Sequence, residues 1–171
     1  DLMAMVSDVE GIERIRYTSP HPKDYPMKLL SLMAERPNIC NQIHMPLQAG
    51  NDRILHKMNR TYTKQEFLDL VKATRNIIPD IAISTDIIIG FPTETWQEIR
   101  QTIKFAEELD LDYAKIFIAI PLRNTEMYDL AVQTDSIIME TYDADSMWTV
   151  GGLIKSKEWT ADDLTILRAD R

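Results

Sequence analysis

Polar side chains that could hold a ligand lie beside apolar segments, where strands are predicted to end. Gln48 follows the apolar segment 41–47, and Asp86 stands just before the apolar run that ends at Ile89. A carboxylate beside so apolar a segment destabilises the fold unless it is hydrogen-bonded. Asp86 therefore either caps a loop or pairs with a basic residue, or it serves a ligand site. The residues alone leave both interpretations open.

Three further residues could take part in binding. Ser19 and His21 lie in a proline-containing loop that follows the predicted strand 12–18. Arg60 closes a predicted short helix, where a positive charge is favourable at the negative end of the helix dipole. A guanidinium could also bind a carboxylate, although spacing alone favours a solvated helix-end residue. His44 lies inside an apolar strand and is interpreted as a core histidine.

Strand and helix patterns alternate along the chain. Strands are predicted at 12–18, 41–47, 81–89 and 113–120, and the main helices at 25–36, 63–78, 95–109, 125–132 and from 160 onward. Such alternation indicates an α/β fold with right-handed βαβ units and a parallel sheet of about four strands. The carboxyl ends of the strands should gather Ser19, Gln48, Asp86 and Pro121, as functional residues do in such sheets. The run Ile87–Ile89 is typical of a strand covered on both faces.

Local signals also mark where two helices start. Asp24 can cap the helix predicted at 25–36. Thr63 and Glu66 form the pattern of a capping box, in which each side chain satisfies a backbone N–H of the first turn.

The composition is that of an acidic, folded domain. Lys and Arg number 19 against 27 Asp and Glu, so the formal net charge is −8 and the chain repels phosphate overall. It is a poor candidate for holding nucleic acid unaided. No apolar run approaches the ~20 residues that a membrane span needs, so no membrane partner is expected. Cys40 is the single cysteine, which excludes a multi-cysteine metal site made by this chain alone and favours a cytoplasmic setting.

The alternating pattern weakens towards the end of the chain. We predict a barrel unit at 1–134 and an extension of uncertain structure at 135–171. The first ten residues have the pattern of a helix that has already begun, so we expect a fragment of a longer protein. A barrel piece without its first strands would expose an unpaired sheet edge, through which chains could associate.

Four motifs follow one another in the first half of the chain. They are Arg14–Pro22, Ile43–Gly50, Leu55-x-x-Met58-x-Arg60-x-Tyr62-Thr63 and Thr85–Glu94. At these spacings they resemble the radical SAM methylthiotransferases, the MiaB-like family, over roughly residues 1–95. The resemblance implies the later part of that family's partial (βα) TIM-type barrel. Three segments of the second half are more similar to cobalamin-binding radical SAM proteins: Glu94–Thr102, Pro121–Tyr128 and Trp159–Arg168.

The resemblance implies roles for the five polar residues. Gln48 and Asp86 would approach the ribose hydroxyls of S-adenosyl-L-methionine (SAM), and Arg60 would pair with its methionyl carboxylate. The residue types suit this, because amide and carboxylate groups bind a diol and a guanidinium binds a carboxylate. This implication reverses the simpler interpretation of Arg60. Ser19 and His21 would face SAM or the substrate.

The family's activity is an expectation that follows from the same resemblance. The intact enzyme would methylthiolate a tRNA adenosine beside the anticodon, with SAM and a [4Fe–4S] cluster as cofactors. The family holds that cluster with a Cys-x3-Cys-x2-Cys loop, which this sequence lacks, so the chain alone is expected to be inactive. A cobalamin-dependent radical SAM enzyme acting on a small molecule or lipid is one alternative, and a non-catalytic barrel fragment is the other.

Overall fold

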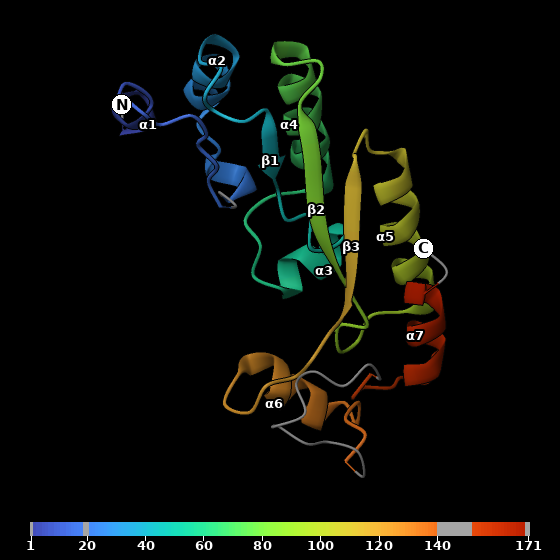
Figure 1. Ribbon diagram of the computed structural model, residues 1–171. Coiled ribbons are helices and arrows are strands. Elements are labelled where there is room, and N and C mark those ends of the chain that lie inside the picture. Colours follow the sequence, from blue (N-terminus) through green and yellow to red (C-terminus); the bar gives the residue numbers. More distant parts are fainter. Residues whose placement is uncertain (1, 19–20, 140–151, 170–171) are drawn as a thin grey trace.

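A parallel sheet of three strands forms the centre of the molecule. The computed structural model describes residues 2–18, 21–139 and 152–169. The strands β1 (Gln42–His44), β2 (Ala82–Ile89) and β3 (Tyr113–Ile118) lie side by side in chain order, as Figure 1 shows. Sequential parallel strands joined by helices are the arrangement of a TIM-type barrel, of which this is a part. The predicted α/β partial barrel is confirmed.

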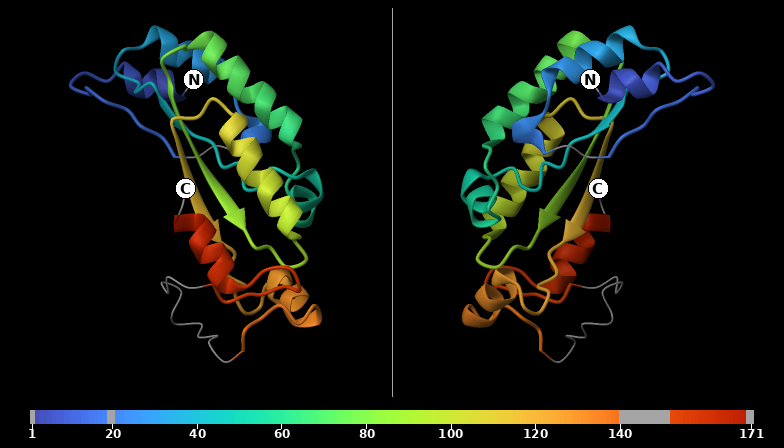
Figure 2. Two further views of the ribbon diagram at one scale, coloured as in Figure 1. Left: turned by 90° about the vertical axis from the view of Figure 1, so that its right-hand side faces the viewer. Right: turned by 90° about the vertical axis from the view of Figure 1, so that its left-hand side faces the viewer.

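The helices mostly follow the predicted alternation. They are α1 (Leu2–Ser7), α2 (Met27–Glu35), α3 (Asp52–Lys57), α4 (Lys64–Ile77), α5 (Trp96–Glu108), α6 (Glu126–Gln133) and α7 (Ala161–Ala169), with a 3-10 turn η1 at Pro22–Asp24. Helices α4 and α5 lie on the same side of the sheet (Figure 2). Among the described residues, no helix is long and apolar enough to cross a membrane.

One face of the sheet is covered and the other is open. Along β2, burial alternates strictly: Ile83, Thr85, Ile87 and Ile89 are buried, while the residues between them are half-buried. The prediction that this strand is covered on both faces is therefore wrong. A complete barrel fills its interior with side chains from all its strands, whereas three strands form an open trough. The half-buried residues, Asp86 among them, line that concave face.

The segment predicted as a first strand pairs at one point. Ile15 forms a single parallel bridge with Ile39, through hydrogen bonds to Asn38 O at 2.7 Å and from Cys40 N at 3.0 Å. The partner segment turns back on itself through a hydrogen bond from Ile39 N to Arg36 O. A turn offers too few extended residues to continue a ladder. Among the described residues the sheet therefore has three strands in place of about four, and the segment predicted as the first strand contributes a single bridge.

Of the two helix starts predicted from capping residues, one is confirmed and the other is wrong. The capping box of Thr63 and Glu66 is confirmed at the start of α4. Asp24 does not cap α2, because it lies in the 3-10 turn and the helix begins only after Pro26. A residue before proline is disfavoured in helical conformation, and Tyr25 is accordingly extended.

Residues after 152 pack against the carboxyl end of β2. Gly90 has φ +78°, and a Cβ atom there would lie 2.5 Å from Cδ1 of Leu164 on α7. The Trp159 indole N–H donates to Glu94 O at 2.9 Å. The segment 152–169 thus both packs against the turn after β2 and hydrogen-bonds to it. The division at residue 134 stays a prediction, and residues 140–151 lie outside the described ranges.

Candidate cofactor-binding site

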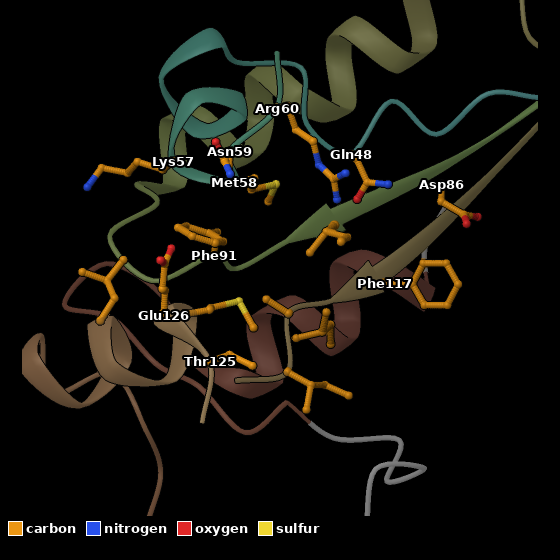
Figure 3. Close-up of a pocket in the computed structure, with 16 residues that line it drawn as sticks. Gln48, Lys57, Met58, Asn59, Arg60, Asp86, Phe91, Phe117, Thr125 and Glu126 are labelled. Carbon is orange, nitrogen blue, oxygen red and sulfur yellow. The ribbon is translucent and has the colours of Figure 1, made fainter. Parts of the chain in front are cut away.

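A pocket of about 750 Å³ lies at the carboxyl ends of the strands. Its walls come from the segment after β1, the end of α3, the last residues of β2 and β3, and the start of α6 (Figure 3). Its volume is typical of small-molecule sites, which measure roughly 300–1,000 Å³. The position agrees with the general location of active sites in such barrels.

Three of the five predicted site residues meet in this pocket. Gln48, Arg60 and Asp86 line it, and the side chains of Arg60 and Gln48 approach each other over the end of β2 in Figure 3. His21 lies elsewhere, with its ring 5.4 Å from that of Tyr62. Ser19 lies outside the described residues.

Gln48 is placed by a break in its strand. His44 pairs with Ser84 whereas Gln48 pairs with Ile87, so the segment after β1 holds one residue more than β2 does, and this bulge interrupts the ladder. The buried hydroxyl of Thr85 bridges the gap, accepting from Leu47 N at 2.8 Å and donating to Met45 O at 2.6 Å. Pairing then resumes from Gln48 N to Asp86 O at 2.9 Å. Gln48 adopts φ 67°, a strained conformation for a residue with a side chain.

Arg60 is placed by the way α3 ends. Asn59 adopts the left-handed conformation with φ 55°. Its N–H donates to His56 O at 3.0 Å, and Arg60 N–H donates to Leu55 O at 2.9 Å. These two bonds are those of a Schellman motif, which turns the chain sharply after a helix. The turn directs Arg60 back to the pocket.

Tyr62 ties the two segments together. Its hydroxyl donates to the carbonyls of Pro46 at 2.9 Å and Leu47 at 3.0 Å. Burial raises the pKa of Tyr62 to about 12, so the hydroxyl stays a donor at neutral pH. Gln48 and Arg60 are therefore held at a fixed separation by a side chain that is itself outside the pocket.

Two buried polar atoms at the pocket have no hydrogen-bond partner among the described residues. They are Oε1 of Gln48 and Nε of Arg60. Buried polar groups in folded proteins are nearly always paired. An acceptor and a donor left unpaired at one pocket are suited to a polar ligand.

Asp86 is held on the concave face by His44. Nε2 of His44 lies 3.3 Å from Oδ2 of Asp86, with 28% and 34% of the two side chains exposed. The interpretation of His44 as a core histidine is therefore wrong: register with β2 turns its side chain to the open face. Asp86 both pairs with a basic residue and lines the pocket, so the two interpretations left open by the sequence are compatible.

The turn beneath the pocket contains a buried acid. Glu94 is 1% exposed, and its Oε2 accepts from Gly90 N at 2.7 Å and Phe91 N at 3.0 Å. Burial raises the pKa of Glu94 to about 7, against the lowering effect of these two backbone donors. Arg53 binds the neighbouring Glu98 and lowers its pKa to about 2.

Sequence reasoning missed part of the pocket wall. Thr125 and Glu126 at the start of α6, and Phe117 of β3, also line it. The loop before α6 was already indicated by its place after a strand. Phe117 could have been found from the alternation of faces along β3, because it is adjacent to the buried Ile118 and pairs with Ile88, which puts it on the concave face.

The residues here do not fit an iron–sulfur cluster. Cys40 lines a second pocket, of about 500 Å³, which is formed at the opposite ends of the strands with Gln42 and Tyr113. Within the described ranges, no three His, Cys, Asp or Glu side chains are grouped to hold a metal ion. The pocket at the carboxyl ends offers amide, carboxylate and guanidinium groups, which suit an organic cofactor such as SAM.

The fold and the pocket define a partial TIM-type barrel with a polar ligand site at its carboxyl edge. The radical SAM superfamily matches residues 1–106, and the chain belongs to that superfamily. Among solved structures, coproporphyrinogen III oxidase (HemN) from Escherichia coli, a radical SAM enzyme, aligns with a TM-score of 0.59 at 19% identity, over 89% of this chain and 30% of that one. Elp3 from Methanocaldococcus infernus aligns with a TM-score of 0.53 at 15% identity, over 67% of this chain and 27% of that one. These likenesses concern the fold.

Curated relatives match this chain at higher sequence identity than these two solved structures do. The tRNA-2-methylthio-N(6)-dimethylallyladenosine synthase of Saccharopolyspora erythraea is 44% identical over 120 residues, which cover 67% of this chain and 24% of that protein. The synthase of the same name from Sulfurihydrogenibium sp. is 42% identical over 130 residues, covering 76% and 30%. The chain thus spans between 24% and 30% of the length of these two relatives.

Proposed function

We propose that this chain forms the SAM-binding part of a radical SAM tRNA methylthiotransferase. The observation that carries the proposal is the convergence of Gln48, Arg60 and Asp86 on one pocket at the carboxyl ends of the strands. The unpaired Gln48 Oε1 and Arg60 Nε support a polar ligand there. The names of the similar proteins support the reaction class and favour it over a cobalamin-dependent enzyme or a non-catalytic fragment.

Each polar residue has a distinct part in binding. Arg60 pairs with the methionyl carboxylate of SAM, since a guanidinium matches the geometry of a carboxylate. Gln48 and Asp86 accept from the ribose hydroxyls. Ile88 and Phe91 provide an apolar wall of the pocket, against which the purine ring packs.

The radical chemistry is supplied by SAM together with a [4Fe–4S] cluster when both are bound, and the residues here bind and orient SAM. The single cysteine lies at the other end of the strands, so the cluster ligands belong to another part of the complete protein. The net charge of this chain is −8, which repels the phosphates of tRNA. Other parts of the complete protein therefore make most of the contacts with the tRNA. The enzyme works in the cytoplasm.

Calorimetric titration with SAM and with decarboxylated SAM tests the proposal. In the complete, cluster-loaded protein, Arg60→Ala should weaken SAM binding by roughly 2–5 kcal/mol, the cost of removing one partner of a desolvated charge pair. Binding of decarboxylated SAM should not change, because the partner of Arg60 is missing from that ligand. Gln48→Ala should cost roughly 0.5–1.5 kcal/mol, as for a neutral hydrogen bond.

Arg14→Ala is the matched control, because Arg14 is exposed and lies outside the pocket. Both arginine variants should unfold within about 1 kcal/mol of the wild-type chain, as most changes without a packing role do. If Arg60→Ala bound SAM as tightly as wild type, the proposed pocket would be wrong.

A further inference from the structure

His44 contacts the carboxylate that the proposed function assigns to the ribose. Its Nε2 lies 3.3 Å from Asp86 Oδ2, and its Nδ1 lies 3.0 Å from Ser84 Oγ. Ser84 and Asp86 are alternate residues of β2, so the three side chains share the concave face. We propose that His44 is a positioning residue that aims Asp86 at the ligand, an inference that rests on the proposed function.

Strand register makes this contact available. His44 pairs directly with Ser84, which places Asp86 at the diagonal position on the neighbouring strand. Diagonal neighbours in a sheet lie about 7–8 Å apart at their Cα atoms, within reach of an aromatic ring. The imidazole therefore contacts both side chains at once, Ser84 through Nδ1 and Asp86 through Nε2.

The proton positions follow from the partners. A carboxylate only accepts, so Nε2 of His44 must carry a hydrogen and donate it to Asp86. Ser84 can donate to Nδ1, or it can accept from Nδ1 while donating to Ile43 O at 3.3 Å. Either arrangement fixes the ring. Asp86 Oδ1 has no hydrogen-bond partner among the described residues and is left for a ligand hydroxyl.

Lys115 also lies beside Asp86, but its ammonium group is turned away. It pairs with Asp86 in the register of β2 and β3, so it lies on the same face. Its Nζ lies 4.7 Å from the centre of the Phe117 ring. No ion pair joins Lys115 to Asp86 in the described part of the chain. The orientation of the carboxylate thus depends on His44.

Two variants of His44 separate positioning from simple loss of a side chain. His44→Gln keeps an N–H near the position of Nε2 and should bind SAM within about twofold of wild type. His44→Leu removes the donor and should weaken SAM binding roughly 2- to 10-fold, the value of one hydrogen bond. A SAM analogue without ribose hydroxyls should bind His44→Leu and wild type equally. Lys115→Gln is the matched control and should leave both affinities unchanged.

The experiment combines calorimetry on the complete, cluster-loaded protein with ¹⁵N NMR of the His44 ring in this chain. Support would be an Nε2–H resonance that shifts in Asp86→Asn, together with a loss in His44→Leu that depends on the ribose hydroxyls and is rescued in His44→Gln. Equal losses for both ligands, or no rescue, would overturn the positioning role. Failure of the wild-type protein to bind SAM would overturn the proposed function, and the NMR comparison would still decide whether His44 holds Asp86.

Discussion

Glu94 connects the pH of the solution to the turn beneath the pocket. Its carboxyl group is buried, and Oε2 accepts from the N–H groups of Gly90 and Phe91, while Oε1 has no partner in the part of the chain that the structure describes. Burial raises the pKa of Glu94 from 4.5 to about 7. A raised pKa means that the folded state binds the proton more tightly than the unfolded state. The resulting stability is present below about pH 4.5 and is lost as the pH rises through about 7.

Replacement of Glu94 by Gln should therefore remove a pH dependence. Between about pH 5 and pH 8, wild-type unfolding free energy should fall relative to Glu94→Gln by up to about 3 kcal/mol. Urea unfolding at each pH measures the difference. Glu98→Gln is the control, because its pKa is lowered to about 2 by Arg53 and its stabilisation is lost only as the pH falls from 4.5 towards 2. Parallel pH curves for wild type and Glu94→Gln would contradict the argument.

At the scale of elements, the end of β1 depends on Thr85. Thr85→Val keeps the shape of the side chain and removes both hydrogen bonds that bridge the bulge after β1, to Met45 O and from Leu47 N. Each backbone group left unpaired should cost roughly 1–3 kcal/mol, and SAM affinity should fall because Gln48 follows directly. Urea unfolding of the chain measures the first effect.

Thr74→Val supplies the matched control for this change. Thr74 is as fully buried as Thr85, but its hydroxyl has no hydrogen-bond partner among the described residues. Removal of an unpaired buried hydroxyl should be neutral or stabilising. Equal destabilisation by the two substitutions would show that the Thr85 bridge has no special role.

At the scale of the whole molecule, the half-barrel leaves apolar surface exposed. β3 has a strand partner on one side only within the described residues, and Tyr113 and Phe117 on it are 62% and 38% exposed. Unpaired strand edges promote association, and lysine at an edge opposes it. We expect this chain to associate with rising concentration and Tyr113→Lys to reduce that tendency. Sedimentation velocity over a concentration series measures it, and a wild-type chain that stays monomeric throughout would contradict the expectation.

Local sequence signals determined much of the architecture. The helices, the three strands after residue 40, the capping box at Thr63 and the break at Gly90 each depend on a few neighbouring residues and appear in the predicted segments. The strand predicted at 12–18 forms only a single bridge. The motifs around Gln48, Arg60 and Asp86 likewise pointed to residues that share one pocket. Short-range patterns of this kind are readable because their physical cause lies within one or two turns of the chain.

Only the tertiary structure decided which surfaces are open and which side chains meet. The apolar run Ile87–Ile89 does not indicate that one face of β2 is open, because the exposure of that face depends on how many strands close the barrel. The contact of His44 with Asp86 depends on strand register across 42 residues of sequence. His21 is placed against Tyr62, a residue far along the chain. Such contacts arise from long-range packing, which neighbouring residues in the sequence do not encode.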